Sequence, residues 1–156
     1  MVSHDPVATA PGTDTSARGR DKKAASSRRT PNIMQKINLA EKLSLIQDHW
    51  NPRIAGELNG QLIKLVKFEG PFTWHHHEHE DEMFMVVKGR FRMDYRDHGE
   101  EHAEWIEPGE FIIVPRGVEH RPFAEAECEV VLFEPASTLN TGNVEDEFTR
   151  KQLETI

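Results

Sequence analysis

The chain has 156 residues, of which 37% are hydrophobic, and a formal net charge of −8. This length suits a single domain, and no run approaches the roughly 18 consecutive apolar residues that a membrane-spanning helix needs. The single cysteine, Cys128, excludes an internal disulfide, and no apolar segment follows the early basic residues as a secretory signal would require. We therefore expect a protein of the cytoplasm.

The charge is unevenly distributed along the chain. Residues 1–31 contain six basic and three acidic residues, a net charge of +3, which leaves −11 for residues 32–156. The first segment is rich in Ala, Ser, Thr, Gly and Pro, a composition typical of disorder. An acidic body disfavours nucleic-acid and anionic-membrane partners. We expect a disordered basic leader over 1–33, a folded domain over 34–137 and a C-terminal tail over 138–156.

The folded part begins with a predicted short helix over 39–49. Asn38 is a suitable N-cap, and Glu41 stands three residues later, as a capping box requires. The helix must end before Pro52. Its apolar residues recur at a spacing that places them on one face, namely Leu39, Leu43 and Ile46.

From residue 53 onward the pattern is typical of short strands separated by Gly and Pro turns. Asn59-Gly60 is a strong hairpin signal, and the turns recur at the spacing of a sandwich or barrel. We therefore predict an all-β, antiparallel domain. Its expected strands are 53–58, 61–68, 72–79, 82–87, 90–96, 102–106, 111–114, 119–123 and 128–133.

A histidine cluster indicates metal chemistry. Four of the nine histidines lie within residues 75–79. In an extended segment alternate side chains share a face, so His75 and His77 project together, and a turn can bring Glu82 beside them. Two imidazoles and one carboxylate form a site for a divalent transition metal. His120 is the best candidate for a fourth ligand.

His77 and His79 are an alternative pair of candidate metal ligands. His77 and His79 also flank one residue, but only two residues then separate His79 from Glu82, which leaves little chain for the turn. We favour His75 with His77, and expect His76 and His79 to point away from the metal. The least specific interpretation is a histidine-rich surface loop that binds metal adventitiously.

The residues around this cluster resemble the first motif of the cupins, G(X)5HXH(X)3-4E(X)6G. Gly70 precedes His75 and His77, four residues lead to Glu82, and six more lead to Gly89. The sequence departs from the motif at one place, because four residues rather than five separate Gly70 from His75.

A second stretch resembles the other cupin motif, G(X)5PXG(X)2H(X)3N. Gly109, Pro115, Gly117 and His120 stand at matching positions, whereas Ala124 replaces the terminal Asn. Nineteen residues separate Gly89 from Gly109. The resemblance extends over about residues 62–134 and is to small, single-domain cupins of the type-2 conserved-barrel kind.

The resemblance implies an antiparallel double-stranded β-helix, the jelly-roll or cupin barrel. It implies one divalent metal at the barrel mouth, Fe, Mn, Ni or Zn, held by His75, His77, Glu82 and His120. Three histidines and a carboxylate leave open positions for Lewis-acid or oxygen chemistry. The resemblance also favours a homodimer. Consistent with that, strand 82–87 carries an outward apolar face that needs cover by the helix or a second subunit, formed by Met83, Met85 and Val87.

The sequence specifies the metal site more closely than it specifies the function. We expect a mononuclear metalloenzyme acting on a small polar organic molecule, with dioxygenase-like or isomerase/lyase-like chemistry. Covalent catalysis is disfavoured, because no dedicated Ser, Cys or Lys nucleophile is evident. The sequence assigns no catalytic residue. The aromatic residues expected to contact the small-molecule ligand are Trp74, Phe84, Tyr95 and Phe123.

Two other functions remain open. One is a non-catalytic small-molecule-binding or sensing protein with a structural metal. The other is a sugar-phosphate isomerase-like enzyme, which would need a cationic phosphate site. The basic residues available for such a site are scattered over different predicted strands and loops: Arg90, Arg92, Arg116 and Arg121.

Overall fold

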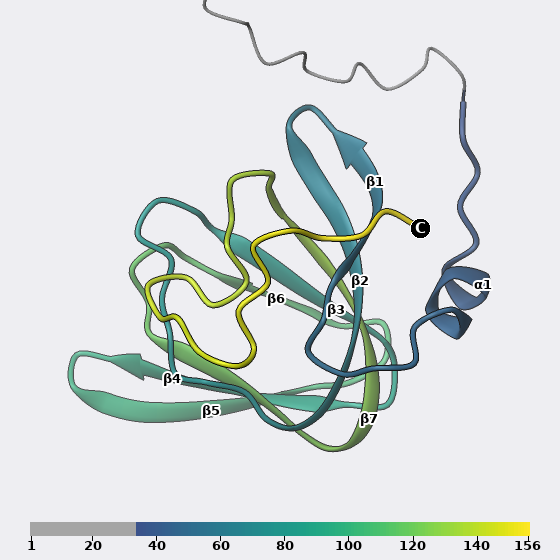
Figure 1. Cartoon of the computed structure of the whole chain (residues 1–156). Helices are drawn as coiled ribbons and strands as arrows, with labels where there is room; N and C mark the ends of the chain where they lie inside the picture. The colour runs from purple at the N-terminus through teal and green to yellow at the C-terminus, as the bar shows by residue number, and fades with distance from the viewer. Residues whose placement is uncertain (1–33) are drawn as a thin grey trace, which may run out of the picture. The chain divides into compact units, whose positions relative to one another are not determined.

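The computed structural model describes residues 34–156, and the expected leader over 1–33 lies outside the described residues. All seven strands of the described chain pair antiparallel with their neighbours, which confirms the predicted jelly-roll barrel (Figure 1). Strands follow one another in space as β1-β2-β7-β3-β6, while β4 pairs with both β5 and β7. The elements are α1 (Leu39–Ser44), β1 (Arg53–Leu58), β2 (Gln61–Pro71), β3 (Glu82–Lys88), β4 (Phe91–Asp97), β5 (Glu100–Ile106), β6 (Phe111–Val114) and β7 (His120–Pro135).

The central element of the barrel is the long strand β7. It pairs with β4 near its start, with β2 along most of its length and with β3 near its end. The sequence predicts two strands here, 119–123 and 128–133, but the structure has one. Pairing with β2 resumes across a register shift, from Phe68 with Cys128 to Gly70 with Ala124, so the acidic residues between them stay within one strand.

The helix ends at Ser44 rather than at His49 as the sequence predicts. The two buried residues that follow belong to different layers: Ile46 packs outside the barrel, whereas Trp50 stacks on Phe68 inside it at 4.4 Å between ring centroids. A continued helix would place both on one face. The chain instead leaves the helix, and Trp50 adopts a positive φ of 58°.

A second apolar cluster lies on the outer face of the sheet. Leu43 and Ile46 pack there with Leu65, and Met85 and Val87 border the cluster. The helix region therefore contributes part of the cover predicted for the outward face of β3.

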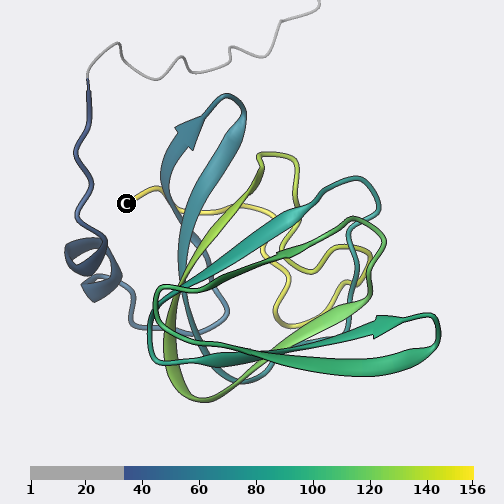
Figure 2. The ribbon, with the colours of Figure 1, turned by 180° about the vertical axis from the view of Figure 1, so that it is seen from behind.

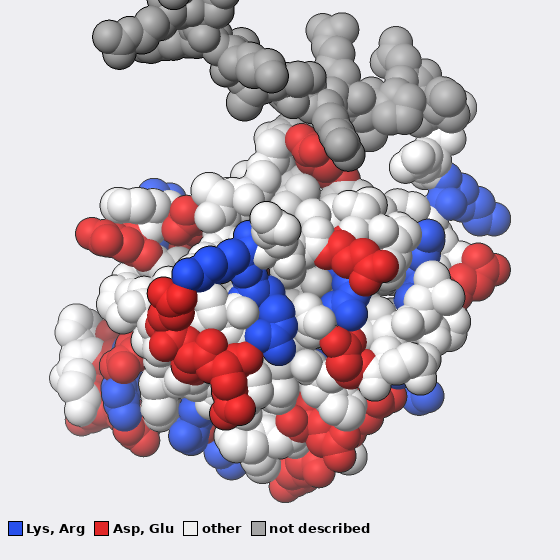
Figure 3. All heavy atoms as spheres, viewed as in Figure 1, with Lys and Arg blue, Asp and Glu red and all other residues white. Residues whose placement is uncertain are grey.

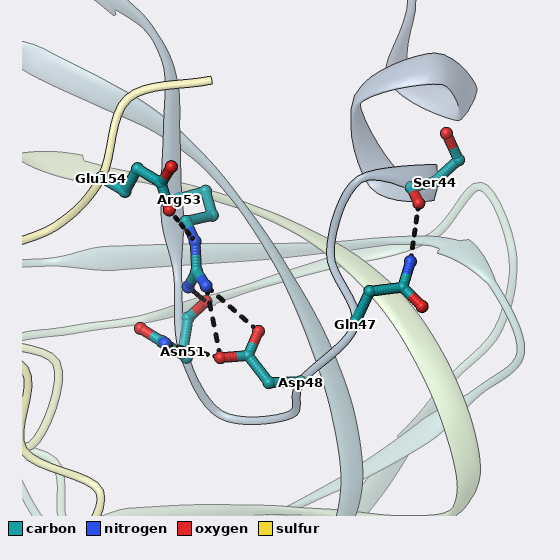
Figure 4. A network of polar contacts seen from close by, with 6 residues as sticks. All are labelled: Ser44, Gln47, Asp48, Asn51, Arg53 and Glu154. Atoms are coloured by element: carbon teal, nitrogen blue, oxygen red, sulfur yellow. Dashed lines mark hydrogen bonds and ion pairs between the residues drawn. The ribbon is translucent and has the colours of Figure 1, made fainter.

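The C-terminal segment, residues 136–156, packs against the barrel. Thr138 and Thr141 are buried, and the segment runs back across the molecule to β1 (Figures 1 and 2). There Thr155 forms a parallel bridge with Ile54. Arg53 adds an ion pair to Glu154, so β1 anchors the end of the chain (Figure 4).

The same arginine ties the C-terminus to the turn after the helix. Its guanidinium also contacts Asp48 at 3.2 Å, and Asn51 donates to that carboxylate at 2.7 Å (Figure 4). The network therefore joins the turn after the helix and the start of β1 to the C-terminal segment, which is distant from both in sequence.

Acidic and basic side chains are interspersed on the face of the molecule drawn in Figure 3. Among the described residues, some charged side chains form small networks, as where Arg96 pairs with Glu101 and Glu119. That face therefore carries no large patch of one sign. Within residues 34–156, no helix has the length and apolar character needed to cross a bilayer.

Gly89 is required at the turn between β3 and β4. Its φ is +77°, and a Cβ there would lie 2.7 Å from the carbonyl oxygen of Glu127. We expect Gly89→Ala to lower the free energy of unfolding by about 1–3 kcal/mol, measured by urea denaturation. Gly99→Ala is a matched control, since Gly99 has a φ of +84° but open space around it. An equal loss in both variants would show that the close contact is unimportant.

Cys128 is fully buried, and burial, with the nearby Glu129 and Glu107, raises the pKa of its thiol to about 12. Because the thiolate is the reactive species, we expect almost no reaction of the folded protein with a disulfide reagent at pH 8. The unfolded protein in urea should react with one equivalent. Rapid labelling of the folded protein would contradict this packing.

Candidate metal centre

The four predicted ligands come from three parts of the chain. His75 and His77 lie between β2 and β3, while Glu82 begins β3 and His120 begins β7. An antiparallel bridge joins His75 to His120 through backbone hydrogen bonds of 3.1 and 2.8 Å. The sequence predicts a strand over 72–79, but the structure has only this isolated bridge within that range.

The side chains of these residues converge inside the barrel. One ligand atom from each lies within 4.8 Å of all the others. Oε2 of Glu82 is 3.2 Å from Nε2 of His77 and 3.6 Å from Nε2 of His120. Two ligands bound at about 2.1 Å to one metal ion lie about 3.0–3.4 Å apart at octahedral or tetrahedral angles. The observed spacing therefore suits joint coordination.

Hydrogen bonding leaves the coordinating atoms free. Nδ1 of His75 lies 3.0 Å from the carbonyl of Thr73, and Nδ1 of His120 lies 2.9 Å from that of Val118. An imidazole that donates from Nδ1 presents the lone pair of Nε2, as metal-bound histidines commonly do.

Three of the atoms are buried without any hydrogen-bond partner among the described residues. They are Nε2 of His77, Nε2 of His120 and Oε2 of Glu82. Buried polar atoms are normally paired, so three orphans facing one point are best explained by a bound cation. The donor set of three imidazoles and one carboxylate fits a divalent transition metal.

The protonation states also suit metal binding. Burial, together with the neighbouring His120, lowers the pKa of His75 to about 3, so its imidazole is neutral at pH 7. Burial alone would raise the pKa of Glu82, but the neighbouring imidazoles of His120 and His77 hold it well below 4.5. The carboxylate of Glu82 is therefore ionised, and it and the neutral imidazole of His75 can bind a metal ion without losing a proton.

The alternative pair of His77 with His79 is not formed. His79 is exposed and lies outside the cluster, as does His76. Both had been expected to point away from the metal.

An aromatic cavity of about 20 Å³ adjoins His75 and Glu82. This volume holds about one water molecule. The four ligand side chains are 0–4% exposed, so the site is closed to solvent. The aromatic residues lining the cavity are Trp50, Phe68, Phe72 and Phe84.

Of the four predicted ligand-contacting aromatics, the structure brings Phe84 to this cavity. Trp74 and Phe123 lie away from it and stack on arginines. Arg96 lies 4.1 Å from the ring centroid of Trp74, and Arg92 lies 5.0 Å from that of Phe123.

Tyr95 lies on a different hollow, of about 360 Å³, between β4 and β6. The backbone of Tyr95 pairs with that of His120 in the β4–β7 register, but none of the four candidate ligands lines this hollow. The ring of Tyr95 stacks on that of the exposed His102, with 5.2 Å between the ring centroids.

A buried ion pair beside the cluster was missed by the sequence reasoning. Nζ of Lys64 lies 2.6 Å from Oε1 of Glu134, and both side chains are 1% exposed. The Glu134 side chain reaches the carboxylate of Glu82. The sequence does indicate this pair, because Lys64 and Glu134 occupy inward positions of strands whose other inward residues are apolar.

The fold and the site together define a jelly-roll barrel with an internal three-histidine, one-carboxylate cluster. Residues 64–134 match the model of the Cupin domain family. The chain is 41% identical to a cupin-2 domain containing protein from Shewanella frigidimarina, with a TM-score of 0.60 over 64% of this chain and 93% of that one. It is 35% identical to protein NMB1881 from Neisseria meningitidis, with a TM-score of 0.59 over 65% and 100% of the two chains. The protein belongs to the cupin family.

Other similarities are more limited. The uncharacterized protein YdbB of Bacillus subtilis is 31% identical over 65 residues, which are 42% of this chain and 55% of that protein. The match thus spans about half the length of that curated relative. Hydroquinone 1,2-dioxygenase from Sphingomonas sp. TTNP3 is 19% identical, with a TM-score of 0.59 over 66% of this chain and 32% of that one, and shares the fold.

Proposed function

We propose that the protein is a mononuclear metalloenzyme that acts on a small organic molecule. The observation that carries this proposal is the set of orphaned, buried coordinating atoms of His77, Glu82 and His120, which His75 completes. These residues would hold one divalent ion, Fe, Mn, Ni or Zn. When bound, such an ion supplies Lewis-acid or oxygen chemistry.

The protein's own residues fix the ion and exclude water. Hydrogen bonds to the carbonyl oxygens of Thr73 and Val118 orient two imidazoles, and the aromatic cavity beside His75 keeps solvent out. Phe84 supplies an apolar contact for a bound molecule at this cavity. The wider hollow at Tyr95 is the second place where a small molecule can approach the ligand-bearing strands.

The test compares two metal forms of the same protein. Protein loaded anaerobically with Fe(II) is assayed for O2 consumption with catechols, diketones and thiols. Protein loaded with Zn, Ni or Mn is assayed by NMR for proton exchange and isomerisation of hydroxy-carbonyl compounds. Turnover in one arm, lost in His120→Ala, supports an enzyme of that reaction class. Failure of both arms with fully loaded protein contradicts catalysis.

A non-catalytic binding or sensing function is the second candidate. The closed site and the water-sized cavity favour it, because a substrate larger than water has no room beside the ligands as they stand. A small molecule that changes metal affinity without being converted would support this function instead.

A sugar-phosphate isomerase-like enzyme has less support. The arginines considered for a phosphate site are each engaged with carboxylates. Arg121 and Arg92 both pair with Asp94, at 2.7 and 2.6 Å. Arg116 pairs with Asp81 at 3.1 Å.

We also propose that two copies associate through the outer face of β3 and β6. Met83 pairs with Ile113 and Met85 pairs with Phe111 across these strands. Ile113 and Phe111 are 58% and 59% exposed, which leaves an apolar patch at the sheet edge. Light scattering should show a dimer for the wild type and a monomer for Ile113→Glu.

A cytoplasmic location also stays a prediction.

A further inference from the structure

The C-terminal segment reaches the metal-ligand loop. Residues 136–156 leave β7, pass the loop that carries His75 and His77, and end on β1 through Thr155. Since β7 begins the segment and β1 holds its end, the middle of the segment is fixed over the loop.

The contact centres on the residue between the two histidine ligands. The backbone N–H of His76 donates to Oδ1 of Asn143 at 2.9 Å. The backbone N–H of Asn143 donates back to the carbonyl of His76 at 3.1 Å. One asparagine therefore satisfies both peptide groups of the residue that links His75 to His77.

The approach is close enough to require glycine beside this asparagine. Gly142 has a φ of +51°, and a Cβ there would collide with the carbonyl of His76 and lie 3.2 Å from Nδ1 of His77. The hydroxyl of Thr141, which is fully buried, donates to the carbonyl of Val144 and so stabilises the turn that presents these residues.

The neighbouring peptide groups of the loop have other partners. His75 pairs with His120, and the carbonyl of His77 accepts from the N–H of Gly117 at 2.7 Å. Among the described residues, only Asn143 holds the backbone of His76. Without that contact the backbone of His76 would be free to move, and the separation of the His75 and His77 imidazoles would no longer be fixed.

We infer that Asn143 is a positioning residue for the metal centre, fixing the separation of the His75 and His77 imidazoles from a segment outside both sequence motifs. This inference rests on the proposed metal site. It predicts that metal affinity depends on a side chain that touches no ligand atom. Partners that orient metal ligands typically contribute 10- to 100-fold to affinity.

The test measures Co2+ affinity by competition with a chelating dye, together with the visible absorption spectrum of the Co2+ protein. We expect Asn143→Ala to bind Co2+ about 10-fold more weakly and to alter the spectrum. Asn143→Asp keeps the acceptor oxygen and should restore both within about 3-fold. Gly142→Ala, which pushes the segment off the loop, should act like Asn143→Ala or more strongly.

A matched control lies in the same segment. Asp146 accepts from the N–H of Phe148 at 2.9 Å, a bond of the same kind and length that does not touch the ligand loop. Asp146→Ala should therefore bind Co2+ like the wild type. Circular dichroism of the metal-free variants checks folding, and Gly142→Ala provides a second perturbation if Asn143→Ala does not fold.

The outcomes separate the inference from the proposed function. If Asn143→Ala and Asp146→Ala bind Co2+ equally, or if Asn143→Asp fails to restore binding, the positioning role is wrong and the metal site stands. If the wild-type protein binds no Co2+, the metal site itself is wrong, and the positioning role with it.

Discussion

Replacing Lys64 with methionine is expected to lower the free energy of unfolding by about 3–5 kcal/mol, the usual effect of removing one partner of a buried ion pair. The pair joins Lys64 Nζ to Glu134 Oε1 at 2.6 Å, and Nζ also lies 3.4 Å from the carbonyl oxygen of Thr138. Without the ammonium, the Glu134 carboxyl group stays buried beside Glu82 with no counter-charge. Urea denaturation followed by circular dichroism measures the loss.

The loss should grow as the pH rises. Burial and the carboxylate of Glu82 raise the pKa of Glu134, and Lys64 opposes that rise. Removing Lys64 raises this pKa further, so the folded variant keeps a proton on Glu134 up to a higher pH than the wild type, whereas the unfolded chain releases it above its ordinary pKa of 4.5. The folded state then binds more protons, so its stability falls with increasing pH. A penalty that is the same at pH 5 and pH 8 would contradict this assignment.

A double variant provides the control. Lys64→Met with Glu134→Gln removes both charges and keeps the shape of the carboxyl side chain. We expect it to be more stable than Lys64→Met alone at pH 8, because no buried carboxyl group then has to keep a proton that the unfolded chain releases. Equal stability of the two would show that packing of the Lys64 chain, rather than charge, is what matters.

Addition of a divalent metal is expected to stabilise the metal-free protein strongly. At a free metal concentration about 1,000 times the dissociation constant, binding to the folded state alone adds about 4 kcal/mol. For a domain of this size that corresponds to a rise in Tm of roughly 10 °C. Thermal melts with Zn2+ or Co2+, reversed by a chelator, measure the effect.

The same melts on His120→Ala test where the metal binds. His120 is fully buried, and its Nε2 has no partner among the described residues. Its loss removes one of four ligands, so the metal-dependent rise should largely disappear. His79→Ala is the matched control, because His79 is exposed and lies outside the cluster. A similar rise in His120→Ala would place the bound metal elsewhere.

Much of the barrel could be predicted because its strands obey local rules. The bounds of β1 and β6 agree with the sequence prediction, since alternation and Gly or Pro turns define both ends. The helix was predicted too long because periodicity cannot show that Ile46 and Trp50 pack in different layers. That separation depends on contacts with Leu65 and Phe68, which are distant in sequence.

The convergence of the four candidate ligands could be predicted because spacing within two motifs determines it. His75, His77, Glu82 and His120 converge as expected, although the segment of the first two is not a strand. Its backbone is held by separate partners, including Asn143. Nothing in the sequence near Asn143 indicates this contact, because the C-terminal segment has no periodicity and its partners are set by the completed fold.

The metal content of the purified protein tests the central claim most directly. Untagged wild-type protein, prepared anaerobically, is compared by elemental mass spectrometry with the His75→Ala/His120→Ala double variant. We predict close to one equivalent of a divalent transition metal in the wild type and a large loss in the variant. Equal metal content in the two proteins, or none in either after exposure to Fe, Mn, Ni and Zn, would contradict a metal centre at these residues.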